Sequence, residues 1–306
     1  MKTIASVDDG SAQLPIVTIG VCVKNCEDLV ADALESIAEQ VFPHELMETI
    51  LIDDGSTDKT LDVMKRKARK LKTVTRIIHQ EWKGLGQARN AVVNNSAGKY
   101  IIWVDCDMQL AKDFVREQVE FMERHSDVGV AKGSYGIYEA NMVSTLENME
   151  FITTNSRRMR RLDPNPLGTG GSIYRIKAIR EVGGFNDSIK GSGEDADAEF
   201  RINKAGWLLD TTSAVFYEKR RNTWRSLLQE YFWHGKGSSR VVKRYTSTNP
   251  YKLLPPVAFV IESIRIVVAY KLTRRKIALL LPIHYAFKRT AWIVGLLQSL
   301  LSSREI

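Results

Sequence analysis

The chain is poor in cysteine, and its three cysteines do not form a recognisable set. Cys22, Cys26 and Cys106 are odd in number, and the spacing between Cys22 and Cys26 is not that of a metal-binding pair. We therefore expect small core or loop residues of a reducing compartment, and a zinc site is disfavoured.

Long apolar runs are also absent. No stretch reaches about 18 apolar residues without a charge, which disfavours a simple membrane-spanning helix. The N-terminal sequence MKTIASVDDGSAQLP is polar, so we expect no signal peptide and a loose tail over residues 1–13. With 306 residues, 44% hydrophobic and 26% charged, the chain is typical of a globular protein with one large domain or two modest ones.

Charge is divided unevenly along the chain. Residues 201–306 carry 19 Lys and Arg against 5 Asp and Glu, a balance of +14 within a net charge of +8. Residues 1–200 therefore carry a balance of −6. A basic tail suits an anionic membrane or nucleic acid, but no nucleic-acid-binding motif accompanies it, so nucleic acid is not expected as a partner.

Strand and helix patterns alternate in the first hundred residues. β-branched apolar runs predict strands at 16–23, at the start of 47–60, at 74–80 and at 100–104. The stretches between them predict a helix from about Glu27 to Val41 capped by Asn25, a helix ending near Leu71, and a helix within 84–99. This alternation predicts right-handed βαβ units and an α/β fold with a Rossmann-like, mostly parallel sheet flanked by helices.

The pattern after residue 110 is less regular. It predicts a strand at 128–138, a helix at 139–163, a glycine-rich loop followed by a short strand and a helix in 167–185, a helix in 189–207 and a strand at 208–218.

Residues 247–306 predict a C-terminal pair of amphipathic helices. Weakly polar residues share one face of each helix: Ala258, Glu262, Arg265 and Ala269 in 253–270, and His284, Lys288, Gly295 and Ser299 in 277–301. The basic stretch KLTRRK (271–276) lies between them. A wide apolar face with basic flanks favours helices at a membrane interface over a helical pair buried in protein.

The stretch YIIWVDCDMQL (100–110) ends an apolar strand pattern with two acids, Asp105 and Asp107. Alternation along an extended backbone would place both acids on one side and Cys106 on the other. The pair fits either a helix cap with an acidic neighbour or a divalent metal site. Asp53 and Asp54 also fall at a strand end, where ligands bind in parallel sheets, and this favours a binding site.

Five stretches together resemble family 2 of the inverting glycosyltransferases, which have the GT-A fold. They are VTIGVCVKN, LIDDGSTDKT, GLGQARN, YIIWVDCD and GGFNDSIKGSGEDADAEFR, in the order and spacing of that family over about residues 14–245. The resemblance implies a GT-A domain over residues 14–246 that binds a nucleotide-diphosphate sugar.

The resemblance also implies a role for each motif. Asp54 would accept a hydrogen bond from the nucleobase, Asp105 would lie near the ribose or sugar, and Asp107 would be the direct ligand of Mn²⁺ or Mg²⁺, with Asp105 beside it. In the acid pair, Asp195 would remove the proton from the acceptor hydroxyl, with Glu194 beside it. Further residues expected at the nucleotide or donor are Val23, Asn25, Asp53, Arg89, Gly170 and Gly171.

Each of these motifs also has a purely structural interpretation. Asp53 and Asp54 could cap the following helix, Arg89 could lie on a helix surface, and the acids after Gly193 could simply favour a helix N-terminus. Residues 230–240 fall where processive family members carry a QxxRW motif, which is absent here. Trp233, His234 and Arg240 are weaker candidates for contacts with the diphosphate or acceptor.

The resemblance, together with the C-terminal helices, implies a metal-dependent inverting glycosyltransferase that moves one sugar, UDP-linked rather than GDP-linked, to a hydroxyl of a lipid-linked or membrane-proximal acceptor. It would lie peripherally at the cytoplasmic face of the cell membrane, and a homo-oligomer is compatible with the sequence. Three alternatives are open: a polyprenyl-phosphate glycosyltransferase, whose acceptor needs no base; a phosphotransferase of the haloacid dehalogenase type; and a catalytically silent membrane-binding scaffold.

Overall fold

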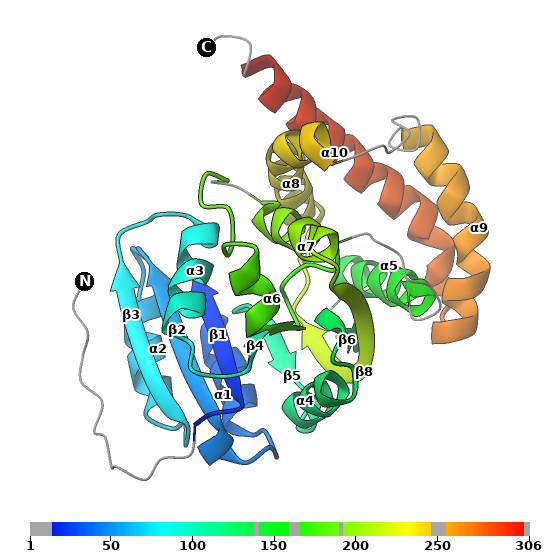
Figure 1. Ribbon diagram of the computed structural model, residues 1–306. Helices are drawn as coiled ribbons and strands as arrows, with labels where there is room; N and C mark the ends of the chain where they lie inside the picture. Colours follow the sequence, from blue (N-terminus) through cyan, green and yellow to red (C-terminus); the bar gives the residue numbers. More distant parts are fainter. Residues whose placement is uncertain (1–13, 138–140, 159–165, 190–191, 246–254, 303–306) are drawn as a thin grey trace. The chain divides into compact units, whose positions relative to one another are not determined.

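The structure is a computed structural model that describes residues 14–137, 141–158, 166–189, 192–245 and 255–302. The chain divides into two compact units (Figure 1). The first comprises Met1–Ser134, Arg161–Lys190 and Glu194–Glu218, and the second Tyr135–Arg160, Gly191–Gly193 and Lys219–Ile306. The predicted tail 1–13 and the predicted domain boundary at 246–247 lie outside the described residues.

An eight-stranded sheet organises the first unit. Its order is β3-β2-β1-β4-β7-β6-β8-β5. Strands β3, β2, β1 and β4 are parallel, and β7 then pairs antiparallel with both β4 and β6. The strands are β1 (Val17–Val23), β2 (Met47–Asp54), β3 (Val74–Gln80), β4 (Tyr100–Trp103), β5 (Met108–Leu110), β6 (Val128–Tyr135), β7 (Ser172–Arg175) and β8 (Leu208–Glu218). The predicted mostly parallel α/β sheet is therefore confirmed.

Helices pack on this sheet and enclose the core. They are α1 (Val30–Ala38), α2 (Thr60–Ala68), α3 (Leu85–Asn95), α4 (Phe114–Arg124), α6 (Ile176–Glu181) and α7 (Glu194–Lys204), with a short 3₁₀ turn at His44–Leu46. Helices α3, α6 and α7 contact one another. They share a buried cluster with β2 and β4 in which Trp103 meets Tyr174 and Phe185 edge to face. Burial of such aromatic and aliphatic side chains is the main stabilising term of the unit.

Two predictions about the start of the first helix are wrong. Helix α1 begins at Val30 rather than near Glu27, and Asn25 does not cap it. Asn25 instead has a left-handed backbone (φ 51°), and its Oδ1 accepts a hydrogen bond from the Thr57 backbone N–H at 2.8 Å. An asparagine side chain tolerates this conformation because it can hydrogen-bond locally, so the residue joins two loops instead of starting a helix.

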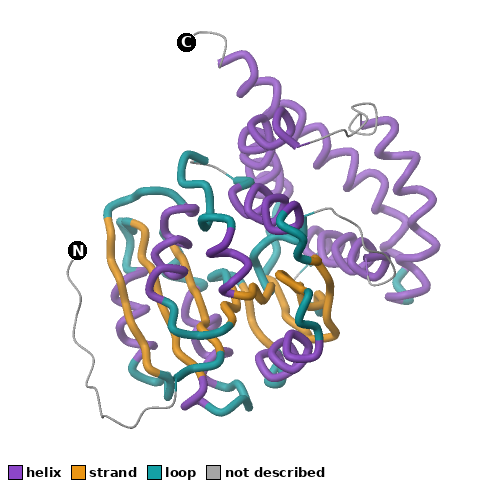
Figure 2. Tube along the Cα trace, in the orientation of Figure 1, coloured by secondary structure: helices purple, strands orange, loops and turns teal. Residues whose placement is uncertain are grey.

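The regular elements that lie within the second unit are helices (Figure 2). They are α5 (Met142–Arg158), α8 (Trp224–Tyr245), α9 (Pro255–Thr273), a 3₁₀ helix at Lys276–Leu280 and α10 (Leu281–Ser302). Helix α10 packs against α8 and α9, and α5 packs against α9. None of the helices in the described ranges combines the length and the hydrophobicity that a transmembrane segment requires.

The polar face of α10 points into its own unit. His284 and Lys288 are buried, and Lys288 Nζ donates hydrogen bonds to Glu147 Oε2 at 3.0 Å and to Glu150 Oε2 at 2.8 Å, both on α5. Gly295 is also buried, against the backbone of α8. Large apolar side chains of α9 and α10 are left exposed, among them Val260, Val267, Ile283, Val294 and Leu301.

Candidate functional site

Three neighbouring parallel strands end at one edge of the sheet and carry the predicted donor residues. Val23 at the end of β1 is in register with Asp53 at the end of β2, and Gly20 of β1 is in register with Trp103, which ends β4. The predicted gathering of strand-end acids therefore follows from strand order, because parallel strands present their carboxyl ends on the same side. The Val23 side chain itself is buried in the core.

Asp54 organises the loop between β3 and α3. Its Oδ1 accepts hydrogen bonds from Gln80 Nε2 at 2.7 Å and from the Lys83 backbone N–H at 3.0 Å, and its Oδ2 accepts one from the Gly84 N–H at 3.0 Å. A carboxylate has about four lone-pair positions, so one acceptor position is left for a ligand. The three hydrogen bonds fix the loop around this carboxylate, and its contact with a nucleobase N–H stays a prediction.

Asp53 lies differently from its neighbour. It is fully buried, and its Oδ2 pairs with His79 Nδ1 at 2.6 Å, while its Oδ1 has no hydrogen-bond partner among the described residues. Trp82, in the loop between β3 and α3, is by contrast 54% exposed. The Lys24 ammonium lies 4.7 Å from the centroid of its ring. The sequence interpretation did not single out either residue. Lys24 lies within the stretch VTIGVCVKN but was given no role there, and Trp82 belongs to none of the five stretches.

The two acids of DCD lie in a turn, not on an extended strand as predicted. Strand β4 ends at Trp103, and the Met108 backbone N–H donates to the Asp105 carbonyl at 3.1 Å. The Asp105 side chain is 44% exposed, and Asp107 is half-buried. Gly170 keeps space beside them, because a Cβ at that position would lie 2.6 Å from Asp105 Oδ2. Half-exposed carboxylate oxygens with such space fit a hard divalent cation.

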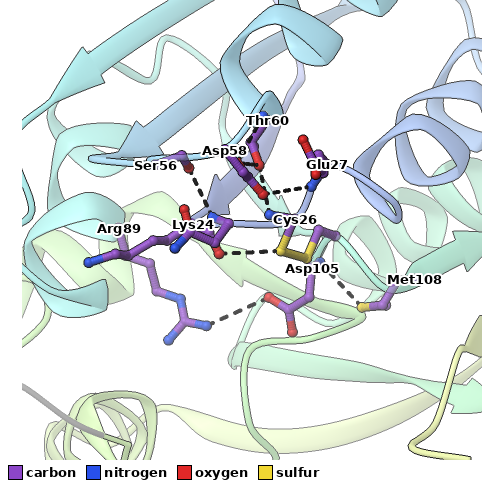
Figure 3. The surroundings of a disulfide bond; sticks show 11 residues. Lys24, Cys26, Glu27, Ser56, Asp58, Thr60, Arg89, Asp105 and Met108 are labelled. Carbon is purple, nitrogen blue, oxygen red and sulfur yellow. Dashed lines mark hydrogen bonds and ion pairs between the residues drawn. A yellow bond between two sulfur atoms is a disulfide. The ribbon is translucent and has the colours of Figure 1, made fainter.

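Arg89 is the cation at the centre of the site. It is 4% exposed, and its guanidinium contacts Glu194 Oε1. Its Nη2 lies 3.8 Å from Asp105 Oδ1 (Figure 3). Burial by itself would lower the pKa of Arg89, but the carboxylates of Glu194, Asp105 and Asp195 raise it above its usual range. Arg89 therefore joins the DCD turn to the acid pair, instead of lying on a helix surface.

The acid pair begins helix α7 and has an unusual electrostatic environment. Burial and the charge of Asp195 raise the pKa of Glu194 to about 7, against the lowering effect of Arg89. Asp195 is half-buried. A Cβ at Gly168 would lie 3.6 Å from both Asp195 Oδ2 and Lys132 Nζ, so this glycine brings the loop close to the carboxylate. Two residues further along α7, Asp197 Oδ2 accepts a hydrogen bond from Arg201 Nε at 2.8 Å.

Sequence reasoning missed a further buried carboxyl on α7, Glu199, beyond the buried Glu194 and Asp197. Glu199 accepts a hydrogen bond from the Tyr174 hydroxyl at 2.6 Å and another from the Leu167 backbone N–H. Burial, together with the charge of Asp195, raises the pKa of Glu199 to about 7. Glu199 thereby ties the glycine-rich loop that begins at Leu167 to the helix of the acid pair. Its position four residues after Asp195 was the available signal.

Gly171 is packed within the sheet. It has φ +71°, its N–H donates to the Trp103 carbonyl at 3.0 Å, and its carbonyl accepts from Gly133 N at 2.9 Å. A Cβ there would meet the ring of Phe216. The structure therefore places Gly170 beside Asp105, whereas Gly171 connects neighbouring strands.

The structure joins two of the cysteines that we expected as separate loop or core residues. Cys26 and Cys106 form a disulfide, with their Cα atoms 6.5 Å apart and a sequence separation of 80 (Figure 3). Cys26 follows β1 and Cys106 follows β4, and these strands are neighbours in the sheet. Cys22 has a free thiol, and burial raises its pKa to about 12.

The weaker candidates Trp233 and His234 lie on α8 in the second unit. With Arg221, Ser226, Gln229 and Glu230 they line an open hollow of about 580 Å³. Glu230 accepts a hydrogen bond from Arg221 Nε at 3.1 Å. Burial by itself would raise the pKa of Glu230, but His234 and Arg221 lower this pKa below its usual value. Arg240 belongs to the same helix, and its side chain lies outside the described ones.

A second group of potential metal ligands occurs in the second unit. Glu147, Glu150 and His284 could each offer one atom to a cation. The Lys288 ammonium already lies between the two carboxylates. Burial by itself would raise the pKa of Glu150, but Lys288 holds this pKa well below its usual range. A divalent ion would have to displace this ammonium, so the DCD turn is the better metal candidate.

Comparison with known proteins identifies the family. The family model for glycosyl transferase family 2 matches residues 18–183. Poly(ribitol-phosphate) beta-N-acetylglucosaminyltransferase TarS of Staphylococcus aureus is 27% identical over 206 residues, which are 64% of this chain and 34% of that protein. A beta-monoglucosyldiacylglycerol synthase of Nostoc sp. is 27% identical over 233 residues, 69% of this chain and 48% of that protein. The chain thus spans about a third to a half of the length of these relatives.

Solved structures confirm the GT-A fold. The mannosyltransferase PcManGT from Pyrobaculum calidifontis, in complex with GDP-Man and Mn²⁺, matches with a TM-score of 0.66 over 95% of this chain and 88% of that chain, at 18% identity. Residues 1–349 of S. aureus TarS, in complex with UDP, match with a TM-score of 0.52 over 94% of this chain and 91% of that chain, at 17% identity. Identities this low show the fold alone.

Proposed function

Because the chain belongs to glycosyl transferase family 2, we propose that it is a metal-dependent inverting glycosyltransferase. It moves one sugar from a nucleotide-diphosphate sugar, UDP-linked rather than GDP-linked, to a hydroxyl of a lipid-linked or membrane-proximal acceptor. The observation that carries the proposal is Arg89, which contacts Glu194 and lies 3.8 Å from Asp105, and so joins the predicted donor turn to the predicted base pair. Family membership sets aside a haloacid-dehalogenase-type phosphotransferase.

The donor nucleotide would lie over the ends of β2, β1 and β4. Asp54 has an acceptor position left for a nucleobase N–H. The exposed Trp82, with Lys24 beside it, offers a flat surface and a positive charge to the same nucleotide. The neighbouring Asn25 holds the loop after β1 against the loop after β2, which keeps this surface in place.

The DCD turn would hold Mn²⁺ or Mg²⁺ through Asp107, with Asp105 beside it. A divalent ion there would neutralise charge on the departing diphosphate. Arg89 restrains Asp105 from one side, and Gly170 leaves the space in front of it. The solved complex of PcManGT with GDP-Man and Mn²⁺ supports testing manganese first.

Asp195 would act as the base that removes the proton of the acceptor hydroxyl. It is half-buried at the N-terminus of α7, beside the glycine-rich loop at Gly168. Its neighbour Glu194 is engaged by Arg89 and is not free for this role. A base of this kind contributes roughly 100-fold to 10,000-fold to the rate.

The second unit would bring the enzyme to a membrane, at its cytoplasmic face. His284 and Lys288 of α10 are buried, while apolar side chains of α9 and α10 are exposed. Basic residues are exposed where these helices meet: Lys271, Arg274, Arg275 and Lys276. Apolar surface with basic residues beside it suits the boundary of an anionic bilayer, where each basic residue contributes about 1 kcal/mol.

Calorimetric titration with UDP and GDP, each with and without Mn²⁺, tests the donor site. We expect Mn²⁺-dependent binding of UDP, weaker binding of GDP, and loss of the metal dependence in Asp107→Asn. A catalytically silent scaffold would bind neither nucleotide, and that result would end the proposal. Tighter binding of GDP would reassign the donor while keeping the enzyme class.

Asp195→Asn separates a hydroxyl acceptor from a phosphate acceptor. We expect nucleotide affinity to be retained and turnover to fall roughly 100-fold or more. Unchanged turnover would exclude Asp195 as the base and favour a polyprenyl-phosphate acceptor, which arrives already ionised.

Flotation with phospholipid vesicles tests the membrane surface. We expect binding to anionic vesicles but not to zwitterionic ones, and a loss of at least about tenfold in Arg274→Glu/Lys276→Glu. Lys65→Glu/Arg66→Glu on α2 is the matched control, because it makes the same charge change at exposed residues of the first unit. Equal losses in both double variants would show only a net-charge effect and refute this surface.

A further inference from the structure

A covalent bond connects the two loops that flank the predicted nucleotide. Cys26 lies in the loop after β1, which ends at Val23, and Cys106 lies between Asp105 and Asp107. Their disulfide therefore joins the loop after β1 to the turn that carries the predicted metal ligands (Figure 3). No step of the proposed reaction uses either sulfur atom.

The loop that carries Cys26 is fastened on its other side by hydrogen bonds. The Cys26 backbone N–H donates to Thr60 Oγ1 at 2.7 Å, and the Asn25 N–H donates to Ser56 Oγ at 2.9 Å. The Glu27 N–H donates to Asp58 Oδ2 at 3.3 Å. Hydrogen bonds thus connect the loop after β1 to the loop after β2, which follows Asp54. The disulfide connects the loop after β1 to the DCD turn after β4.

We propose that Cys26 and Cys106 are a redox-modification site that sets the affinity for the donor nucleotide. The disulfide holds the DCD turn against the loop after β1, and reduction releases it. Restraint before binding lowers the cost of ordering these segments around a ligand, so the reduced form binds nucleotide and metal more weakly. This inference rests on the proposed function, and on the proposed cytoplasmic location, where disulfides belong to the reversible, redox-sensing class.

The chemistry needs a low-molecular-weight disulfide such as oxidised glutathione as oxidant. One protein thiolate attacks the S–S bond of the reagent, which forms a mixed disulfide and releases one reduced thiol. The second protein thiolate then attacks the protein sulfur of the mixed disulfide and displaces the remaining half of the reagent. Two protein S–H bonds are lost, one protein S–S bond forms, and the reagent leaves as two thiols. Cys26 and Cys106 are both half-buried, so a small reagent can reach them. Cys22 does not compete, since a thiol with a pKa of about 12 stays protonated near neutral pH.

The test compares the full chain after incubation with oxidised glutathione and after incubation with dithiothreitol. Alkylation in denaturant followed by mass measurement counts the free thiols, and we expect Cys22 alone in the oxidised form and all three cysteines in the reduced form. Titration of each form with UDP and with GDP, both in the presence of Mn²⁺, then measures affinity. We expect reduction to weaken binding by about threefold to tenfold, the effect of ordering one or two side chains.

Two variants separate the disulfide from other effects of the reagents. Cys22→Ala should keep the redox response, whereas Cys26→Ser/Cys106→Ser should bind like reduced wild type under both conditions. Circular dichroism melting checks that both are folded, and Cys26→Ala/Cys106→Ala replaces the serine pair if it is not.

The outcomes that overturn the inference are distinct from failure of the proposed function. Three free thiols after oxidised glutathione, equal affinity in the two states, or an equal redox response in the double variant would each refute the redox role and leave the glycosyltransferase proposal standing. If the thiol count changes but neither form binds either nucleotide, the proposed function fails, and the role of this disulfide at a donor site fails with it.

Discussion

Replacing Arg89 by methionine should destabilise the protein by an amount that grows with pH. Arg89 is 4% exposed, and its guanidinium contacts the buried Glu194. Methionine keeps much of the length of the side chain but removes its charge, which leaves the Glu194 carboxyl without a cation. Breaking a buried ion pair by removing one partner costs about 3–5 kcal/mol.

The pH dependence follows from the pKa of Glu194, which burial and the Asp195 charge raise to about 7. A carboxyl whose pKa is higher in the folded than in the unfolded chain loses its stabilising contribution as the pH rises from the ordinary value of 4.5 through about 7. In Arg89→Met this pKa moves further up, because Arg89 is the group that lowers it. Between about pH 6 and 8 the folded wild type releases a proton that the folded variant keeps. Over this range the free energy of unfolding of the variant therefore falls by about 1.4 kcal/mol more than that of the wild type.

Urea unfolding at about pH 6, 7 and 8 measures this difference. Arg116→Met is the control, because Arg116 pairs with Asp113 at 2.7 Å on the surface and its loss should cost less than about 1 kcal/mol at every pH. In Arg89→Met/Glu194→Gln the titrating carboxyl is gone, and the extra pH dependence should vanish. Equal destabilisation of Arg89→Met at the lowest and highest pH would refute the assignment to Glu194.

Three further substitutions test single contacts. Gly170→Ala places a Cβ 2.6 Å from Asp105 Oδ2, so we expect weaker Mn²⁺-dependent nucleotide binding in calorimetry with a similar melting temperature, and unchanged affinity would contradict the metal assignment. Lys288→Met leaves two carboxylates of α5 without their ammonium and should lower the free energy of unfolding in urea by about 3–5 kcal/mol. The control Lys271→Met, at an exposed residue, should lower it by less than about 1 kcal/mol, and equal effects would argue against a buried ion pair. Gly295→Leu forces a side chain into the backbone of α8 and should lower the free energy of unfolding by about 1–3 kcal/mol. An unchanged urea midpoint would show that α8 and α10 can move apart to accept the side chain.

Elements with strong periodicity were predictable from sequence. The apolar runs of β1, β2, β3 and β4 and the glycine-led helix α3 were expected close to where the structure has them. The gathering of Asp54 and Asp105 at one sheet edge also followed, because parallel strands end on the same side. The start of α1 was wrong, since the capping pattern at Asn25 is local and the competing hydrogen bond from Thr57 comes from another loop.

Partnerships between distant residues were not predictable. Arg89 and Glu194 are 105 residues apart, and Lys288 and Glu147 are 141 apart, so no local pattern pairs them. The pairing of Cys26 with Cys106 depends likewise on β1 and β4 being neighbours. Periodicity correctly grouped His284 and Lys288 on one face of α10. Which face turns inward was set by the acids of α5, because a buried ammonium requires a carboxylate partner.

The ion cluster of α5 and α10 has a consequence for synthesis of the chain. Helix α5 leaves the ribosome with Glu147 and Glu150 in place, but their cation at Lys288 follows 141 and 138 residues later. At about 5–20 residues per second, this delay is roughly 7–28 seconds. During that time the two acids have no ammonium to neutralise them and must stay hydrated. The buried ion cluster of the helical unit therefore cannot form until α10 has been synthesised.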